Sequence, residues 1–349
     1  MKLHQMQLPR EVILGNNTIE LVTQICRKLG FSKSAFMVTG TTTYEIAGRK
    51  VIDLLKDSGI EIDHLLVSSS TIKDVNAVRT KINETKPQVV LGVGGGTKID
   101  VAKLSAARQG IPFISVPTTA SHDGIASPLA SVKGAEKPYS VMAQAPMAII
   151  ADTTVIVQAS HRLTASGCGD VIAKLTAVRD WYLAHKVKGE YYGEYAASLA
   201  LMSAKLVARN ADLIKPSDEE GLRVLLEALI SCGVAMSIAG SSRPSSGSEH
   251  LFSHALDLVA SEHALHGEQA GVGTVMMACL HGLNWRRIKS KLEKVGAPTT
   301  AEELGVKSEY VVESLVRASS IRPERYTILD EKKLTHKSAE ALAKKTGVI

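Results

Sequence analysis

The chain has 349 residues, 45% of them hydrophobic and 22% charged, so it is long enough for two domains with a large buried core. Its net charge of +6 is spread along the chain and its aromatic content is only 4%, which together disfavour a nucleic-acid-binding protein. The four cysteines form no CxxC pair and no segment reaches eighteen uninterrupted apolar residues, so we expect a cytoplasmic protein without a disulfide framework or membrane insertion.

The first 150 residues alternate short apolar runs with helical patterns. The predicted strands are "SAFMVTG" (34–40), "IDHLLVS" (62–68), "QVVLGVGGG" (88–96) and "IPFISVPTT" (111–119). The predicted helices between them cover 42–59, 71–87 and 97–110. A hairpin and a last short strand, "MAIIAD", follow within 127–152. This alternation indicates βαβ units and a Rossmann-like parallel sheet with helices on both faces.

Beyond about residue 160 the pattern changes, because every long apolar run has helical periodicity. The predicted helical runs cover 167–187, 193–214, 219–240, 247–271 and 271–295. We therefore expect two domains, an α/β domain at 1–160 and an all-helical domain at 161–349. Clefts between domains are common ligand sites, so we expect the active site in the cleft between these two.

A glycine-rich turn, "LGVGGGTKIDVAK", places Gly94, Gly95 and Gly96 between a predicted strand and a predicted helix. Such a turn lets the backbone approach a pyrophosphate at a helix N-terminus. Neither G-x-x-x-x-G-K-[ST] nor G-x-G-x-x-G fits it, and no carboxylate ends the strand at 34–40 to bind a ribose hydroxyl. The turn therefore predicts phosphate binding outside the standard fingerprints and leaves the choice of NADH or NADPH open; a tight turn without a ligand is the alternative.

Histidines in "GSEHLFSHALDLVASEHALHGEQAG" suggest a metal site. His250 and His254 are four residues apart on one predicted helix, and His266 follows where that helix should end. Two histidines and one carboxylate would complete a catalytic zinc site with an open position, and Asp170 in "SGCGDVIAK" is the candidate carboxylate. HExxH is absent, which excludes a zincin protease. The alternatives are an ordinary histidine pair on a helix and a helix N-cap at Asp170.

Five motifs occur in order over nearly the whole chain: "GVGGGTKIDVAK", "ISVPTTASHDGIASPLASV", "GCGDVIAK", "RPSSGSEHLFSHALD" and "HALHGEQAGVG". Together they resemble the sn-glycerol-1-phosphate dehydrogenase family of archaeal membrane-lipid synthesis. That family shares a superfamily with glycerol dehydrogenase, iron-containing alcohol dehydrogenases and dehydroquinate synthase, and "SHDGIASP" and "SGSEHLFSHALD" single it out. The resemblance implies reversible reduction of dihydroxyacetone phosphate to sn-glycerol 1-phosphate by NADH or NADPH, with one zinc ion.

The resemblance also implies roles for particular residues. The zinc ligands would be Asp170, His250 and His266. Asp123, Asp170 and His254 would contact the substrate as catalytic residues, whereas His263 receives no role. The residues implied to line the dinucleotide are Gly94, Gly95, Gly96, Thr97, Lys98, Ile99, Asp100, Thr118, Thr119, Ala120, Ser121 and Ser127.

In the implied reaction, zinc polarises the C2 carbonyl and a proton reaches the alkoxide through His254 or Asp123. We expect the substrate phosphate near Arg243, Ser245, Ser246 and Ser248, just before the metal-binding helix. The rival functions are a glycerol dehydrogenase acting on unphosphorylated polyols, a lyase of the dehydroquinate synthase type, and a non-catalytic nucleotide-binding protein. The apolar helices of the second domain lead us to expect a homo-oligomer.

Overall fold

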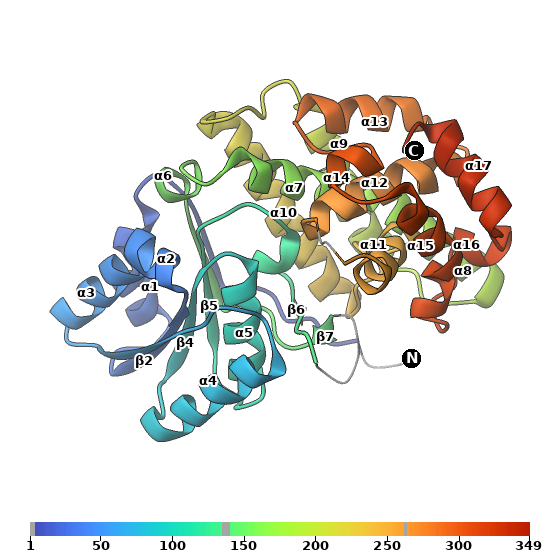
Figure 1. Cartoon of the computed structure of the whole chain (residues 1–349). Coiled ribbons are helices and arrows are strands. Elements are labelled where there is room, and N and C mark those ends of the chain that lie inside the picture. Colours follow the sequence, from blue (N-terminus) through green and yellow to red (C-terminus); the bar gives the residue numbers. More distant parts are fainter. Residues whose placement is uncertain (1–3, 135–139, 262–263) are drawn as a thin grey trace. The chain divides into compact units, whose positions relative to one another are not determined.

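The computed structural model describes residues 4–134, 140–261 and 264–349 (Figure 1). It divides into two compact units, Met1–Ala159 and Ser160–Ile349. The first unit contains a parallel sheet with helices, and the second is helical. The predicted combination of an α/β domain with an all-helical domain is confirmed.

The first unit is built on a six-stranded parallel sheet with strand order β1-β8-β5-β4-β2-β3. Its strands are β1 (Glu11–Gly15), β2 (Ser34–Thr39), β3 (Glu61–Leu66), β4 (Val89–Gly94), β5 (Phe113–Pro117) and β8 (Ala148–Asp152). All the predicted strands are present. One strand, β1, has no counterpart among the predicted strands; it is a five-residue edge strand beside β8 whose side chains are only partly buried.

Helices cover both faces of this sheet, with α1 and α3 on one face and α4 and α5 on the other (Figure 1). The α-helices of the first unit are α1 (Val22–Lys28), α2 (Thr41–Thr43), α3 (Arg49–Asp57), α4 (Ile72–Thr85), α5 (Gly96–Ala107) and α6 (Thr153–Ile156). The predicted helix at 42–59 is present as α2, a π-helical turn and α3. The predicted hairpin is present as β6 (Leu129–Ala130) antiparallel to β7 (Val141–Met142).

The strand order creates a switch point between β2 and β4. The chain leaves β2 toward β3 on one side and leaves β4 toward β5 on the other. Open parallel sheets bind ligands at such a point, beyond the carboxyl ends of the strands. The turns after these two strands are in contact, because a Cβ added at Gly40 would clash with the side chain of Lys98. The glycine turn therefore lies at the expected ligand-binding edge of the sheet.

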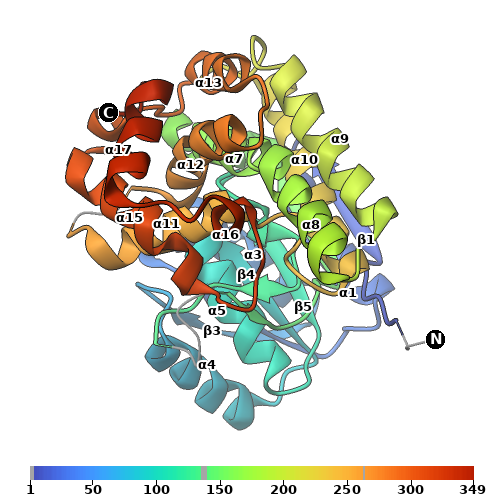
Figure 2. The ribbon, with the colours of Figure 1, turned by 90° about the vertical axis from the view of Figure 1, so that its right-hand side faces the viewer.

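The second unit consists of eleven helices in the part of the chain that the structure describes. These helices are α7 (His161–Ile172), α8 (Lys174–Lys188), α9 (Glu194–Arg209), α10 (Glu219–Ala239), α11 (Ser248–Val259), α12 (His266–Leu280), α13 (Trp285–Lys294), α14 (Ala301–Leu304), α15 (Ser308–Ile321), α16 (Ile328–Lys332) and α17 (His336–Thr346). In Figure 2, α8, α9 and α10 lie side by side. One helix, α10, is long and apolar enough to cross a membrane, but most of it is buried, as in a core helix.

Three of the predicted helical runs are divided in the structure. The run 167–187 changes from α7 to α8 at Ala173, and 247–271 contains α11 and the start of α12. The run 271–295 contains a turn at Gly282, whose φ of 69° favours glycine, before Asn284 caps α13. Periodicity missed the breaks at Ala173 and Gly282, because the apolar spacing continues through each of them, whereas the end of a helix before His266 was expected. The cysteines Cys26, Cys168, Cys232 and Cys279 are free.

Candidate functional site

Three side chains predicted to bind a metal lie together in the second unit. Asp170 comes from α7, His250 from α11 and His266 from the first position of α12. Each offers one ligand atom, and these atoms all lie within 4.8 Å of one another. Two imidazole nitrogens and one carboxylate oxygen are a donor set that suits a divalent zinc ion with a position left open. The residues present therefore fit the metal that the sequence motifs imply.

Glycines explain why these three helices come so close. A Cβ added at Gly267 would clash with the backbone carbonyl of Ser166, and one added at Gly169 would clash with the carbonyl of Gly267. A Cβ at Gly273 would lie 2.9 Å from the Glu249 carbonyl oxygen. The motifs "GCGD" and "HGEQAGVG" thus supply the backbone contacts that bring α7 and α11 against α12.

Glu249 orients one of the histidines. Its side chain is fully buried, and its Oε1 lies 2.8 Å from Nδ1 of His250. Glu249 also accepts hydrogen bonds from Thr176 Oγ1 at 2.7 Å and from the Gly247 amide at 2.6 Å. Holding Nδ1 leaves Nε2 of His250 directed to the triad, where it lies 3.4 Å from Asp170 Oδ1. The carboxylate therefore sets the orientation of the ring, as outer-shell carboxylates do at metal sites.

Asp170 is an interior residue of α7, so the alternative of a helix N-cap is wrong. The Lys174 ammonium lies 2.6 Å from Asp170 Oδ1, and both side chains are buried. Burial opposes a charge on Asp170, but Lys174, His250 and His266 outweigh it and hold the pKa of that carboxyl well below its usual range. Asp170 is therefore a carboxylate at neutral pH, as a metal ligand must be.

His254 lies one turn below His250 on α11, and its ring centroid is 5.9 Å from that of His266. Burial, followed by the positive charges of His266, His250, Arg322 and Arg325, lowers the pKa of His254 well below its usual value. His254 is therefore a neutral imidazole beside the triad. The fourth histidine of the stretch, His263, lies outside the described residues.

Arg243, expected at the substrate phosphate, is already paired. Its Nε donates to Glu190 Oε1 at 2.6 Å and its Nη2 donates to Glu190 Oε2, while Nη1 donates to the Tyr326 carbonyl at 3.1 Å. Ser248 is also occupied, because its amide and hydroxyl both donate to Asp180 Oδ2. These two members of the expected phosphate site are held in structural contacts.

Two other arginines lie near this loop. Arg325 is 9% exposed and donates from Nη1 to the Ser246 carbonyl at 2.6 Å and from Nη2 to Ser242 Oγ at 2.7 Å. Arg322, also buried, directly follows α15, which packs along α11. Burial and the charges of Arg322 and Arg243 lower the pKa of Arg325 to about 9, so it remains charged at neutral pH. The concentration of positive charge in a buried place favours a bound anion.

A buried hydroxyl belongs to the same loop. Ser245 is 2% exposed, and its Oγ has no hydrogen-bond partner in the part of the chain that the structure describes. Unsatisfied buried hydroxyls are costly, so such an atom indicates a missing ligand or water. Ser245 is therefore the one serine of the expected phosphate set whose hydroxyl is both buried and available.

In the first unit, the glycine turn connects β4 to α5, as expected. Gly94 has φ of 153°, and a Cβ there would lie 2.9 Å from Lys98 Cβ. The Thr118 amide donates to the Gly94 carbonyl at 3.0 Å, which joins this turn to the one after β5. A Cβ at Gly95 would lie 3.3 Å from Thr119 Oγ1. A Cβ at Gly96 would lie 1.7 Å from His122 Nε2, so side chains pack closely on this turn. The turn lies at the N-terminus of a twelve-residue helix, a position suited to a pyrophosphate.

The other expected dinucleotide residues lie around this turn. Thr97 and Lys98 are in the first turn of α5, Thr118 to Ser121 follow β5, and Ser127 follows a 3-10 turn at Asp123–Ile125. The Ile99 side chain is fully buried in the core. Asp100 accepts hydrogen bonds from Lys103 at 3.2 Å and from the Ser131 amide at 3.0 Å. Ile99 and Asp100 therefore support the glycine turn from inside the first unit.

Lys103, which the sequence analysis did not single out, holds the "SHDG" segment against α5. Its fully buried ammonium donates to the carbonyls of Gly124 at 2.7 Å and Leu129 at 2.5 Å. Burial lowers the pKa of Lys103, and the Asp100 and Asp123 charges oppose this. Lys103 therefore positions the segment that carries Asp123. The signal was present, since a lysine in a buried stretch of helix needs partners.

Comparisons with known proteins agree with this architecture. The family model described as iron-containing alcohol dehydrogenase matches residues 13–160. Relatives named glycerol-1-phosphate dehydrogenase [NAD(P)+] are 56% identical in Pyrococcus furiosus and 54% identical in Thermococcus kodakarensis. The first alignment covers 99% of this chain and 100% of the relative, and the second covers 100% and 99%. The corresponding relative from Methanosarcina mazei is 53% identical, over 99% of this chain and 96% of its own length.

Solved structures show the same fold at low identity. Glycerol dehydrogenase from Schizosaccharomyces pombe has a TM-score of 0.82 and 22% identity, covering 99% of this chain and 91% of that one. A probable glycerol dehydrogenase from Sinorhizobium meliloti has a TM-score of 0.78 and 20% identity, covering 99% and 100%. At this identity the likeness establishes the fold alone.

Proposed function

The chain belongs to the glycerol-1-phosphate dehydrogenase family, and from this premise we propose that it interconverts dihydroxyacetone phosphate and sn-glycerol 1-phosphate with NAD(H) or NADP(H). It is an oxidoreductase acting on a CH–OH group, and its product is the glycerophosphate backbone of archaeal membrane lipids. The observation that carries the proposal is the Asp170, His250 and His266 triad in a chain so similar to relatives of that name.

The first unit binds the dinucleotide. Gly94 to Gly96 let the pyrophosphate approach the N-terminus of α5, whose amides donate to it. Thr118, Thr119 and Ser121 supply hydroxyls beside the turn. The nicotinamide supplies the hydride when it is bound. No carboxylate follows β2 to repel a 2′-phosphate, so these residues permit both NAD(H) and NADP(H).

Zinc is the metal that suits the triad of the second unit. Asp170, His250 and His266 hold it, and Glu249 keeps His250 in the ligating orientation. A bound zinc ion supplies Lewis-acid polarisation of the substrate carbonyl. The buried Lys174 keeps Asp170 ionised before the metal arrives.

The proton that completes reduction comes from His254 or Asp123. His254 is on the same face of α11 as His250 and is neutral when the substrate is absent. Neutral imidazole relays a proton by accepting at one nitrogen while donating from the other. Asp123 is the second candidate, and Lys103 positions its segment.

The substrate phosphate binds to Arg322, Arg325 and Ser245 rather than to Arg243. Arg325 uses two of its five N–H groups in its contacts with Ser246 and Ser242, which leaves three for phosphate oxygens. Phosphate oxygens would also accept a hydrogen bond from the Ser245 hydroxyl. After burial and the charges of His266 and His250, the charges of Arg322 and Arg325 also lower the pKa of His254, so these arginines lie near the residue beside the triad. This set distinguishes a phosphorylated substrate from glycerol or dihydroxyacetone.

We further propose that the enzyme works in the cytoplasm as a homo-oligomer and binds neither nucleic acid nor membrane. The dispersed basic residues support the absence of nucleic-acid binding, and the burial of α10 supports the absence of membrane insertion.

The decisive experiment measures NADH and NADPH oxidation with dihydroxyacetone phosphate and with dihydroxyacetone, each with and without a chelator. We expect oxidation with the phosphorylated substrate that stops on chelation and returns with zinc. Product of sn-1 configuration should not be oxidised by sn-glycerol-3-phosphate dehydrogenase.

Each rival function has its own signature in this assay. Faster turnover of dihydroxyacetone would identify a glycerol dehydrogenase. Phosphate release from a substrate of the dehydroquinate synthase type without net cofactor oxidation would identify a lyase. A protein that contains no zinc and oxidises neither cofactor would be a nucleotide-binding protein only.

A further inference from the structure

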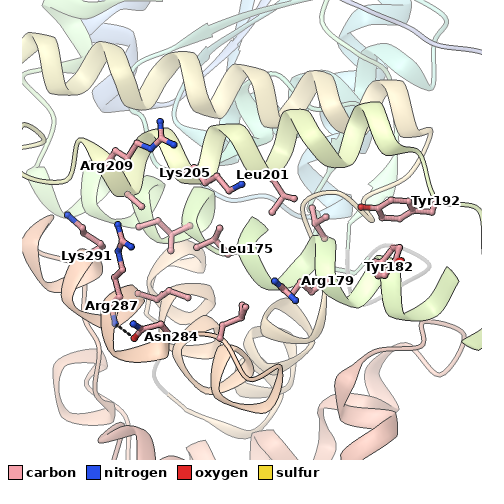
Figure 3. Close-up of a pocket in the computed structure, with 15 residues that line it drawn as sticks. Leu175, Arg179, Tyr182, Tyr192, Leu201, Lys205, Arg209, Asn284, Arg287 and Lys291 are labelled. Carbon is pink, nitrogen blue, oxygen red and sulfur yellow. Dashed lines mark hydrogen bonds between the residues drawn. The ribbon is translucent and has the colours of Figure 1, made fainter. Parts of the chain in front are cut away.

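A cavity of about 570 Å³ opens in the second unit between α7, α8, α9 and α13 (Figure 3). Its lining is mostly apolar, with Ile172, Leu175, Val178, Leu201 and Ile288 among its residues. The volume falls within the range of about 300–1,000 Å³ that is typical of small-molecule sites. None of the metal-triad residues or of the arginines assigned to the substrate phosphate lines it, so it is separate from the proposed active site.

Basic side chains gather at this cavity. Lys205 and Arg209 lie one turn apart on α9, and Arg287 and Lys291 lie one turn apart on α13, which contacts α9. Figure 3 shows these four side chains toward one end of the cavity and two tyrosines toward the other. A fifth basic residue, Arg179, also lines it. Arg179 lies nearer the tyrosines in Figure 3, so the cavity has four basic side chains toward one end and a fifth beside its aromatic end.

No carboxylate balances this charge from the cavity lining. Lys291 lies 3.8 Å from Asp212, but that carboxylate is held at 2.6 Å by Lys294. The other four basic side chains of the lining have no carboxylate partner within residues 4–134, 140–261 and 264–349. Basic side chains that lie one helical turn apart repel one another, and a bound anion would offset that repulsion.

We propose that this cavity binds a small anionic amphiphile. A phosphate-type headgroup contacts Lys205, Arg209 and Arg287, and an alkyl chain lies against Leu175 and Leu201. Charge decides between this occupant and a second copy of the chain. A copy would have to place carboxylates at the basic end, whereas a phosphate headgroup brings its own negative charge to Lys205, Arg209 and Arg287.

The test titrates decyl phosphate, below its micelle-forming concentration, into the full-length protein by calorimetry. Tryptophan fluorescence gives a second readout, because the chain's two tryptophans, Trp181 and Trp285, lie on α8 and α13. We expect one molecule bound per chain. Inorganic phosphate should bind far more weakly, since it lacks the chain, and decyltrimethylammonium should not bind, since its charge has the wrong sign.

A paired variant locates the site. The double variant K205Q/R209Q should weaken decyl phosphate binding by about tenfold or more, the effect expected when charged hydrogen bonds are lost. The control K337Q/K345Q removes the same charge from exposed positions of α17 and should bind like the unmodified chain. Circular dichroism and thermal melting confirm that both variants fold.

Several outcomes would overturn the proposal. Equal weakening in the two double variants, or binding of decyltrimethylammonium as tight as decyl phosphate, would show non-specific association. If inorganic phosphate binds as tightly as decyl phosphate, the cavity is a site for an ion and not for an amphiphile. Binding to phosphatidylglycerol vesicles but not to decyl phosphate would assign a membrane surface. A lack of binding, together with a change in sedimentation caused by K205Q/R209Q, would assign an interface between copies.

Discussion

The assignment of Arg325 to the substrate phosphate leads to a sharp prediction. Arg325→Gln removes a guanidinium that has three N–H groups left for the phosphate oxygens after its contacts with Ser246 and Ser242. A hydrogen bond to a charged group contributes about 1.5–3 kcal/mol, so kcat/KM for dihydroxyacetone phosphate should fall by about 10- to 150-fold. Turnover of unphosphorylated dihydroxyacetone should stay within about twofold, because that substrate never contacts Arg325.

The matched control is Arg243→Gln. Arg243 is another buried arginine of the same cluster, but its charge is neutralised by a bidentate pair with Glu190. We expect this variant to lower the melting temperature while the preference for the phosphorylated substrate stays unchanged, because it leaves Glu190 without its partner. Inorganic phosphate, tested as a competitive inhibitor, supplies a readout that does not depend on turnover of dihydroxyacetone. Its inhibition constant should rise only in Arg325→Gln.

The assignment of the phosphate site fails if Arg325→Gln reduces turnover of both substrates equally, since that result indicates distortion of the loop. It fails equally if Arg243→Gln changes the preference as much as Arg325→Gln does. Ser245→Ala refines the result, because its hydroxyl has no partner to lose in the described structure. The cost should be about 0.5–1.5 kcal/mol, or about 2- to 12-fold in kcat/KM for the phosphorylated substrate.

Three further predictions concern the metal and the turn. Glu249→Gln should weaken zinc binding by about 10- to 100-fold in chelator competition, because His250 loses its orienting carboxylate. The control Glu227→Gln on α10 should leave zinc affinity unchanged. Equal zinc affinity in the two variants would contradict the orienting role of Glu249. Gly267→Ala should destabilise the chain by about 1–3 kcal/mol, or about 2–12 °C in melting temperature, because α7 and α12 must separate. The zinc content should fall as well. An unchanged melting temperature would show that the contact between Gly267 and Ser166 is not tight. Lys103→Met should lower the free energy of unfolding by about 3–5 kcal/mol, because it leaves Asp100 buried without its lysine partner. It should also raise KM for the dinucleotide while the zinc content stays normal. A normal KM in a folded variant would show that Lys103 has no positioning role.

Much of the fold was predictable, because its signals are local. Alternating apolar runs and helical patterns predicted the strands that became β2, β3, β4 and β5, and the loss of strands beyond residue 160 predicted the helical unit. The short edge strand β1 and the breaks at Ala173 and Gly282 were missed. A five-residue, half-exposed strand has little pattern, and a turn at Gly282 interrupts the chain without interrupting its apolar spacing.

For the site, the sequence by itself determined which residue types are available and which of them share a helix. His250 and His254 had to lie on one face of a helix because they are four residues apart, and the family motifs supplied Asp170 as their partner. Their metal and substrate roles stay predictions that the zinc and substrate measurements will test. The "GGG" turn likewise had to place backbone without side chains between β4 and α5.

Only the tertiary structure decided which charges are neutralised and which remain for a ligand. Arg243 looked suited to a phosphate until Glu190, fifty-three residues earlier, proved to be its partner, whereas Arg325 lies seventy-nine residues beyond the Ser246 carbonyl that it contacts. The physical reason is the distance along the sequence over which each kind of interaction acts. Helix and strand patterns depend on neighbours a few residues apart, but a buried charge is satisfied by whichever group the packed helices bring beside it.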